Sequence, residues 1–428
     1  MGAASGYAIA RAVNQADAPL LVVTADVQAA ARLTDEICFF LDDPTLEVLG
    51  FPDWETLPYD VFSPLPELIS QRLLTLHRLR GLQRGVIVVP VATLMQRLLP
   101  PEFLDANSLL LEVGDDLDME DFRQRLVAGG YQCVSQVMAH GEFAVRGSLL
   151  DLFPMGSEQP FRIDLLDCEV DSIRIFDPET QRTSEKIGRI SLLPAREFPV
   201  DEQSVARFRA AYREQIEGDP QRSLIYRGVS DGQMPGGIEY YLPLFFEHTA
   251  TLFDYIARDS LVLYDRRLDD EAVHFFDSVG ERYEQRRYDL ERPLLQPGAL
   301  YLAPEQLHSR LAAHRRVQLQ PGDADCAEHH GPCLNLPSRP VPPMGIQAKA
   351  ANPAQALQQT LATANARVLF VAETAGRREA LLDTLRGFDI RPTYSESWHD
   401  FVAADISPCI TVASLESGLW LSDQGLLL

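Results

Sequence analysis

Cysteine is scarce in this sequence, and no apolar segment is long enough to cross a membrane. Six cysteines are spread over 428 residues without a signal peptide before them: Cys38, Cys133, Cys168, Cys326, Cys333 and Cys409. We therefore expect reduced thiols in a cytoplasmic protein rather than a disulfide-stabilised secreted one. The longest apolar runs, such as 85–92, have the length of a buried strand and fall far short of the roughly 20 residues that span a bilayer.

Basic residues are outnumbered by acidic ones. The chain has 38 Lys and Arg against 62 Asp and Glu, a net charge of -24 at pH 7. Such a surface repels a phosphate backbone over most of its area. Nucleic-acid binding would need a local basic patch or another part of the protein, and protein partners suit this charge better. With 46% hydrophobic residues, the chain can bury a sizeable core, and its length predicts roughly two to four domains.

The spacing of apolar residues predicts an α/β protein with an inserted α+β unit. In the first hundred residues, buried-strand runs such as Leu20–Val23 alternate with helical spacing, as in a doubly wound parallel sheet. From about 108 to 195 the pattern changes to short alternating strands, which predict an antiparallel sheet. A helix precedes these strands near 118–128, and Asp115 and Asp116 are its expected caps.

The second half of the chain predicts helices, a linker and a further α/β domain. Residues 200–320 are expected to be helical with one strand at Leu261–Tyr264, and 321–353 is a Pro-, Gly- and His-rich linker or long loop. Another α/β domain begins with a strand at Arg367–Ala372. Both ends look cut, since the last residues resemble an unfinished strand, so we expect a fragment of a longer protein.

The expected α/β frame lacks the residues of a working nucleotide site. A phosphate loop needs a Lys for the phosphates and a hydroxyl for Mg²⁺, but the candidate Gly2–Gly6 is followed by Tyr7 and has no Lys or Arg before Arg11. After the strand at 261–264, Asp265 could hold a metal, but Arg266 follows where a water-polarising carboxylate is needed. These two losses predict a chain with no ATPase activity, no catalytic residue and no cofactor.

Several long motifs, in order along the chain, resemble the bacterial transcription-repair coupling factor. Phe51–Pro64 and Gly85–Gln96 resemble its first domain, and Gly141–Pro154 resembles a stretch that it shares with UvrB, the damage-loading subunit of the excision nuclease. Gly236–Phe246 also resembles the coupling factor, and Gly376–Leu381 resembles its third N-terminal domain. A match over nearly the whole chain is far more specific than a lone glycine motif.

This resemblance implies a degenerate P-loop-type, UvrB-like fold and a non-catalytic N-terminal scaffold that recruits UvrA in transcription-coupled nucleotide excision repair. In the family, an ATP-driven DNA translocase and the contacts to RNA polymerase and DNA lie downstream. The alternative is an active UvrB-like or helicase-like ATPase module, which predicts nucleotide binding. The implied layout is domain 1A at 1–107, inserted UvrA-binding domain 2 at 108–195, domain 1B at 196–320, a linker at 321–352 and a truncated domain 3 at 353–428.

Strand alternation in the inserted unit points to a partner-binding face. It places Arg162 and Leu166 opposite the core-facing Phe161, Ile163 and Leu165, and Arg146 opposite Phe143 and Val145. Arginines around an exposed leucine suit a small interface core, although each could instead pair with a nearby carboxylate: Asp151, Asp164, Asp167 or Glu169.

The resemblance implies that Arg146, Arg162 and Leu166 bind UvrA, with Leu166 at a position where the family can have Phe. Charge reversal at Arg146 or Arg162 is then expected to abolish UvrA binding and to leave the fold intact.

Two further signals favour structural explanations. Cys326, His329, His330 and Cys333 have a spacing that is typical of zinc ligands. All four lie within eight residues, which makes a tetrahedral cage hard to close without a second loop, so we expect no metal site. Three aromatic residues could stack on bases, yet no basic residue lies between 51 and 71, so packing in a core or domain interface is favoured. These aromatic residues are Trp54, Tyr59 and Phe62.

Overall fold

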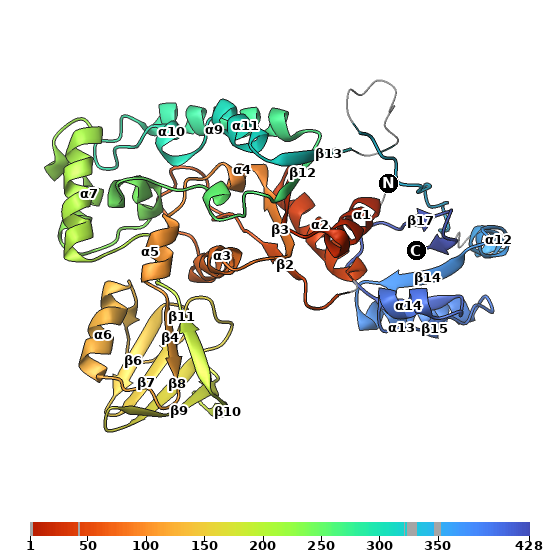
Figure 1. Ribbon diagram of the computed structural model, residues 1–428, viewed down its shortest axis with the longest axis horizontal. Helices are drawn as coiled ribbons and strands as arrows, with labels where there is room; N and C mark the ends of the chain where they lie inside the picture. Colours follow the sequence, from red (N-terminus) through yellow and green to blue (C-terminus); the bar gives the residue numbers. More distant parts are fainter. Residues whose placement is uncertain (1–2, 42, 321, 323–331, 346–351) are drawn as a thin grey trace.

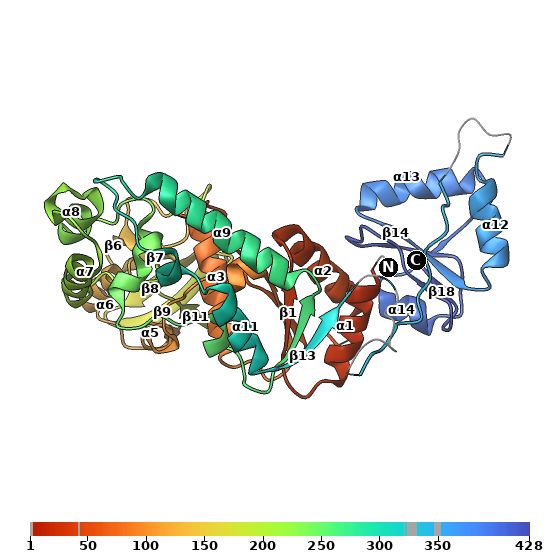
Figure 2. The same ribbon diagram turned by 90° about the horizontal axis from the view of Figure 1, so that it is seen from above.

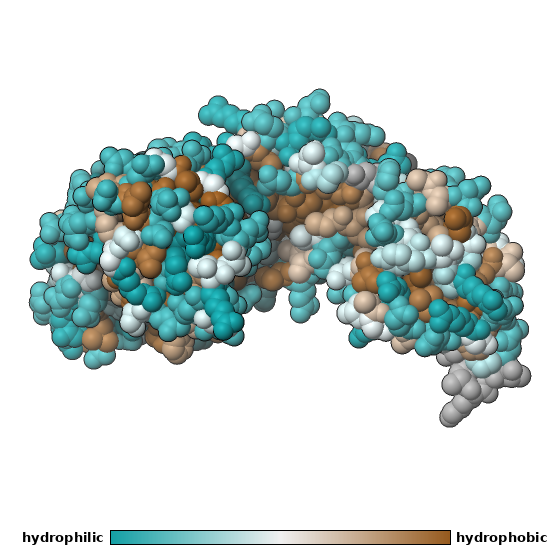
Figure 3. Space-filling model, turned by 90° about the horizontal axis from the view of Figure 1, so that it is seen from below, coloured by the Kyte–Doolittle hydropathy of each residue, from teal (hydrophilic) through white to brown (hydrophobic). Residues whose placement is uncertain are grey.

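The computed structural model describes residues 3–41, 43–320, 322, 332–345 and 352–428. Figure 1 shows three lobes: a central one, one below it built on a six-stranded sheet, and a C-terminal one at the right. In the described part of the chain, no helix combines the length and the apolar character needed to cross a membrane. Seen from below, the outer lobes are largely hydrophilic, and hydrophobic side chains gather in the recess between them (Figure 3).

A parallel sheet forms the centre of the molecule, in the strand order β13-β12-β1-β3-β2. Every residue of β1 and β3 is buried because cores lie on both faces of the sheet. Alternation directs Leu20 and Val22 into one core and Leu21 and Val23 into the other. The strands are β1 (Leu20–Thr24), β2 (Glu47–Gly50), β3 (Gly85–Pro90), β12 (Leu261–Asp265) and β13 (Arg315–Leu319).

Helices cover both faces of this sheet, as Figure 2 shows from above. One core is closed by α1 (Ala4–Gln15) and α2 (Val27–Phe40), and Asp26 caps α2 through the backbone N–H of Ala29. Helices on the other side are α3 (Pro66–Leu79), α4 (Val91–Leu94), α9 (Leu268–Arg286) and α11 (Pro304–Ala312). The mixed α/β class expected from the sequence is confirmed.

The six-stranded sheet is joined to the central lobe through a short antiparallel pair of strands, β4 (Leu109–Glu112) and β11 (Arg189–Leu192). Helix α6 (Met119–Ala128) packs Phe122 and Leu126 into the core of this unit. The strands follow the order β10-β9-β8-β7-β6-β5. Their bounds are β5 (Gln132–Cys133), β6 (Glu142–Arg146), β7 (Leu149–Phe153), β8 (Phe161–Leu166), β9 (Glu169–Phe176) and β10 (Thr183–Ile187).

Two expectations for local structure were wrong. Asp118 caps α6 through the N–H of Asp121, whereas Asp115 accepts from the N–H of Glu112 in a preceding turn. The segment 200–320 contains a second strand, β13, whose exposed residues carry no buried-strand signal. The remaining elements of this segment are α7 (Glu202–Gln215), α8 (Leu224–Ser230), α10 (Pro297–Leu300) and the 3-10 turns η1 (Pro220–Arg222), η2 (Ile238–Phe245) and η3 (Leu252–Asp254).

The C-terminal lobe is a second α/β unit, with the strand order β15-β16-β14-β18-β17. It packs on α1 and α2 through aromatic rings, and the ring centroids of Phe40 and Trp398 lie 5.1 Å apart. Its strands are β14 (Arg367–Ala372), β15 (Thr393–Tyr394), β16 (Cys409–Val412), β17 (Trp420–Leu421) and β18 (Leu426–Leu427). Its helices are α12 (Gln355–Thr363), α13 (Ala375–Arg386) and α14 (Trp398–Ala403).

The state of the cysteines agrees only in part with the expectation of reduced thiols. Cys38, Cys133, Cys168 and Cys409 are free cysteines, as expected. Cys333, in contrast, forms a disulfide, so the expectation of reduced thiols throughout was wrong for that residue.

Candidate partner-binding face

The outer face of the six-stranded sheet carries a row of five side chains in register, and four of them are charged. Pairing between neighbouring strands places Ala144, Asp151, Arg162, Arg174 and Lys186 side by side from β6 to β10. Because side chains alternate between faces, the adjacent row points into the core that α6 covers. That core row consists of Val145, Leu150, Ile163, Ile173 and Ile187.

Asp151 joins the two arginines expected at this face. Its Oδ1 accepts from Nε of Arg162 at 2.6 Å, and its Oδ2 accepts from Nη2 of Arg162 at 2.9 Å and from Nη2 of Arg146 at 2.7 Å. Asp151 is 2% exposed, so two cations share one buried carboxylate. Pairing with a nearby carboxylate, the alternative raised from the sequence, is therefore real, but it leaves this cluster with a net positive charge.

The two arginines differ in their freedom. The Arg162 side chain is only 21% exposed, donates to the carbonyl of Gln181 at 3.3 Å and lies 5.2 Å from the ring centroid of Phe176. Its hydrogen bonds to Asp151 raise the pKa of its guanidinium. The Arg146 side chain is 53% exposed. It follows that Arg146 can reach a partner, while Arg162 is held as part of the surface beneath it.

Leu166 lies at the end of β8, on the same face as Arg162, and is 70% exposed. Asp167 follows in the left-handed region at φ 56°, which closes the turn into β9. At the same end of the sheet, β6 and β7 meet in a turn where Gly147 has φ 64°. Thus an uncovered leucine and a half-exposed arginine lie near adjacent turns, and Leu166 is on the face that strand alternation predicted.

The N-terminal turn of α1, where the sequence offered its phosphate-loop candidate, is filled by protein. A Cβ added at Gly6 would meet Cβ of Glu36 at 2.3 Å, so α2 packs directly on this turn. The backbone N–H of Ala3 donates to the carbonyl of Gly418 at 3.3 Å, and Tyr7 packs in the aromatic cluster with Trp398. Residues 1–2 of the candidate loop lie outside the described residues.

A carboxylate takes the place where a phosphate would need to approach α1. Glu36 is 1% exposed, and burial raises the pKa of its carboxyl group against the opposing effects of Arg32 and the Gly6 backbone N–H. Its Oε1 has no hydrogen-bond partner. A second anion at this turn would face a buried acidic group.

At the end of β12, Asp265 is engaged by a neighbouring arginine. Its Oδ1 accepts from the backbone N–H of Arg267 at 2.8 Å and pairs with the Arg267 guanidinium at 3.3 Å. This interaction raises the pKa of Arg267. Among the described residues, no group of three or more His, Cys, Asp or Glu side chains is placed to hold a metal ion.

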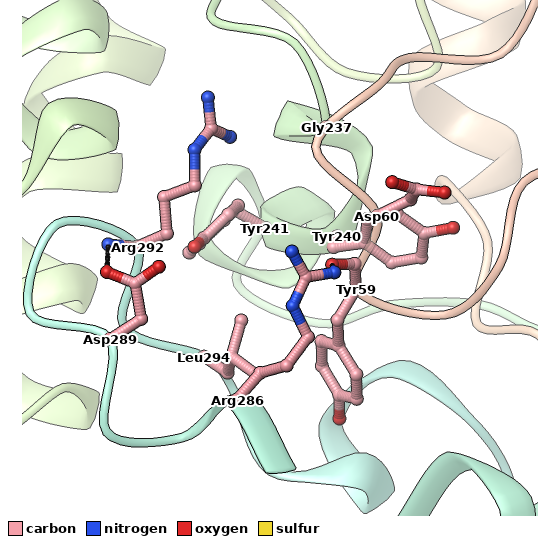
Figure 4. A pocket seen from close by; sticks show the side chains of 9 residues that line it. All are labelled: Tyr59, Asp60, Gly237, Tyr240, Tyr241, Arg286, Asp289, Arg292 and Leu294. Carbon is pink, nitrogen blue, oxygen red and sulfur yellow. Dashed lines mark hydrogen bonds between the residues drawn. The ribbon is translucent and has the colours of Figure 1, made fainter. Parts of the chain in front are cut away.

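A polar cavity lies between the loop after β2 and the end of α9, as Figure 4 shows, but it measures only about 10 Å³. That is room for about one water molecule. Its arginines are occupied by backbone carbonyls, since Arg286 donates to Tyr59 at 2.6 Å and Arg292 donates to Gly236 at 2.8 Å. These hydrogen bonds hold the surrounding loops together, and the cavity is too small for a nucleotide.

The aromatic residues between the strands of the first domain separate into two groups. Trp54 and Tyr59 are buried, as expected, with hydrogen bonds to Glu197 and to the carbonyl of Leu295. Phe62 is 70% exposed, so packing was the wrong expectation for that residue. The hypothesis on metal binding near 326–333 is untested because Cys326, His329 and His330 lie outside the described residues.

Sequence reasoning missed three members of the outer face. Gln181 supports Arg162 from the turn after β9, at φ 58°, where no residue pattern marked it. Arg174 and Lys186 extend the row toward the sheet edge. Alternation in β9 could have placed Arg174 on this face, but its register against Arg162 needed the bulge between Asp164 and Leu165.

Comparison with known proteins fits this arrangement. The family model described as "UvrB interaction domain" matches residues 109–198, and the one described as "MFD, D3 domain" matches residues 360–428. The chain is thus, by class, an α/β protein that carries a UvrB interaction domain.

Three similar proteins share one name. The chain is 42% identical to the transcription-repair-coupling factor of Haemophilus influenzae, over 97% of this chain and 36% of that protein. It is also 42% identical to that of Escherichia coli K12, over 91% of this chain and 34% of that protein, and 31% identical to that of Bacillus subtilis, over 62% and 23%. The chain is thus similar to transcription-repair coupling factors over nearly its whole length, and it spans about a third of the length of the Haemophilus influenzae and Escherichia coli proteins.

Proposed function

We propose that this chain is a non-catalytic scaffold in transcription-coupled nucleotide excision repair and that its six-stranded sheet recruits UvrA. The observation that carries the proposal is the pair Arg146 and Arg162, bridged by Asp151. This pair lies beside the exposed Leu166, on the face opposite the core. These residues fall within the 109–198 match to the UvrB interaction domain. An arginine and an apolar side chain next to a net positive cluster are typical of the centre of an interface.

The proposal has three parts that concern the division of the chain and its setting. Domain 1A at 1–107, domain 2 at 108–195, domain 1B at 196–320, a linker at 321–352 and domain 3 at 353–428 remain our division of the chain. ATP-driven translocation and contacts with RNA polymerase and DNA belong, on this proposal, to parts of the relatives that this chain does not cover. The location is the bacterial cytoplasm, where these partners act.

We propose further that the α/β frame is a degenerate P-loop-type fold that does not bind or hydrolyse ATP. Two observations support this. Glu36 and Gly418 occupy the start of α1, and Arg267 engages Asp265 at the end of β12. Both features place protein groups of the wrong charge, or simply protein bulk, where phosphate and metal would need to lie.

Calorimetric titration of the chain with UvrA, and separately with Mg-ATP, tests both parts. Arg146→Glu should weaken UvrA binding at least thirtyfold, since loss of a central interface Arg costs about 2 kcal/mol or more. The matched control is Arg123→Glu on α6, which reverses an exposed charge on the other side of the same unit. Equal UvrA affinity for Arg146→Glu and the parent chain would contradict the scaffold proposal, and micromolar Mg-ATP binding would restore the ATPase alternative.

A further inference from the structure

A row of cations continues across the outer face of the six-stranded sheet beyond the residues proposed to bind UvrA. Arg162 on β8 lies directly opposite Arg174 on β9, and Arg174 lies directly opposite Lys186 on the edge strand β10. Neighbouring strands are about 4.8 Å apart, and like charges directly opposite one another destabilise a sheet. Three cations in line therefore need compensation from some other group.

Compensation is present at only one end of the row. Asp151 neutralises one charge of the pair Arg146 and Arg162. In the part of the chain that the structure describes, no ion pair joins Arg174 or Lys186 to a carboxylate, and the buried Nε of Arg174 has no hydrogen-bond partner. Lys186 is exposed. Because Asp151 and the carbonyl of Gln181 already occupy the guanidinium of Arg162, the unused donors of this row belong to Arg174 and Lys186.

Edge protection explains part of this arrangement but not all of it. A lysine on an edge strand discourages pairing with another sheet, and this accounts for Lys186 taken alone. It does not account for Arg174, which lies on an interior strand with a buried, unpartnered nitrogen. In a chain with a net charge of -24 and only two lysines, Lys186 and Lys349, an uncompensated cation row is a local exception.

We infer that Arg174 and Lys186 extend the partner-binding face to the sheet edge and receive carboxylates from an acidic strip on the protein partner. This inference rests on the proposed recruitment of UvrA by the same face. The ligand chemistry is a pair of carboxylates at about the spacing of adjacent strands, because each cation comes from its own strand. Arg146 and Leu166 anchor the other end of the contact.

An acidic strip on a protein partner suits this face better than a nucleic-acid backbone does. The net charge of -24 repels an extended phosphate backbone around this face, whereas a short acidic strip meets only the cation row. Asp151 and Asp164 alternate with the cations, in the same row and the next one. Leu166 adds an apolar contact that a phosphate backbone does not use. Alternating charges beside an apolar residue are instead what complementary protein surfaces present.

The test is titration of UvrA with the double variant Arg174→Gln, Lys186→Gln at low, physiological and high salt. We expect about tenfold weaker binding at physiological salt and a shallower salt dependence, because charges at the rim of an interface act on association. The matched control removes the same charge elsewhere on the unit, through Arg123→Gln and Arg189→Gln, and should bind as the parent does. A charge-retaining pair, Arg174→Lys with Lys186→Arg, should keep most of the affinity.

The outcomes separate this inference from the proposal beneath it. If Arg146→Glu loses UvrA while the double Gln variant binds like its parent, the extension is wrong and the recruitment proposal stands. If neither variant loses affinity, both are wrong. Equal weakening by the double Gln variant and the control pair would show a nonspecific charge effect and overturn the extension. If the double Gln variant instead loses salt-dependent binding to a labelled DNA duplex and keeps its UvrA affinity, the cation row binds phosphates and the extension is wrong. Melting temperatures of all variants confirm that each is folded.

Discussion

The indole Nε1 of Trp54 donates a 2.7 Å hydrogen bond to Oε2 of Glu197, and both side chains are buried. The other oxygen of Glu197 accepts from Nε of Arg72 at 2.8 Å. The guanidinium of Arg72 also lies 4.4 Å from the ring centroid of Phe51. One carboxylate therefore ties the loop after β2, helix α3 and the segment that follows the six-stranded sheet.

Removing this carboxylate should destabilise the central lobe strongly. Glu197→Ala would leave the fully buried Arg72 without its anion, and breaking one side of a buried pair costs about 3–5 kcal/mol. Urea denaturation measures the loss. Glu112→Ala is the control, because Glu112 is half-exposed and makes only a 3.9 Å contact with Arg189, so it should change the free energy of unfolding by less than about 0.5 kcal/mol. Similar losses for both variants would contradict the assigned role of Glu197.

The sequence predicted what strand alternation and burial dictate locally, and it failed where partners come from distant segments. The core and outer faces of β8 and the exposure of Leu166 followed from a period of two. The bond between Trp54 and Glu197 joins residues 143 positions apart, so no local pattern contains it. In the same way, Asp151 was one of four nearby carboxylates, and only strand register selects it.

Charge reversal at Arg162 should destabilise the inserted unit, unlike reversal at Arg146. Arg162→Glu would place a second carboxylate against the buried Asp151, which would keep only its ion pair with Arg146. A fall in melting temperature for Arg162→Glu, with little change for Arg146→Glu, is the expected result. The neutral Arg162→Gln should lie between them. An intact melting temperature for Arg162→Glu would restore the simpler expectation drawn from the sequence.

Asp151 should act as a positioning residue for the partner-binding face. Asp151→Asn removes one negative charge, so a face that works by charge alone would bind an acidic partner more tightly. We expect weaker UvrA binding instead, by about tenfold, because the amide keeps only one acceptor oxygen for Arg146 and Arg162 and turns a donor NH2 group toward them in place of the other. The unit should also lose about 2 kcal/mol of stability.

Titration of UvrA and urea denaturation give the two readouts for Asp151→Asn. Tighter binding would show that net charge, and not the alignment of the arginines, governs the contact. As a charge-matched control, Asp171→Asn removes a carboxylate from an exposed position on β9 and should leave both quantities nearly unchanged.

The buried carboxyl group of Glu36 should make stability fall as pH rises. Burial raises its pKa above the ordinary value of 4.5, with smaller contributions of the same sign from Glu416 and Asp35 and an opposing one from Arg32. The folded state then binds the proton more readily than the unfolded state does, so the stabilisation present at low pH is lost as pH rises from about 4.5 through the raised pKa.

The neutral variant Glu36→Gln should therefore melt at a higher temperature than the parent at pH 8, and its advantage should shrink as pH falls toward 4.5. An amide keeps the shape of the side chain and an acceptor for Gly6, and it removes only the charge that burial disfavours. Glu120→Gln is the control, since that exposed carboxyl has a pKa lowered by its hydrogen bond to Arg123 and should give no gain at pH 8. A lower melting temperature for Glu36→Gln at pH 8 would mean that the ion pair with Arg32 outweighs burial.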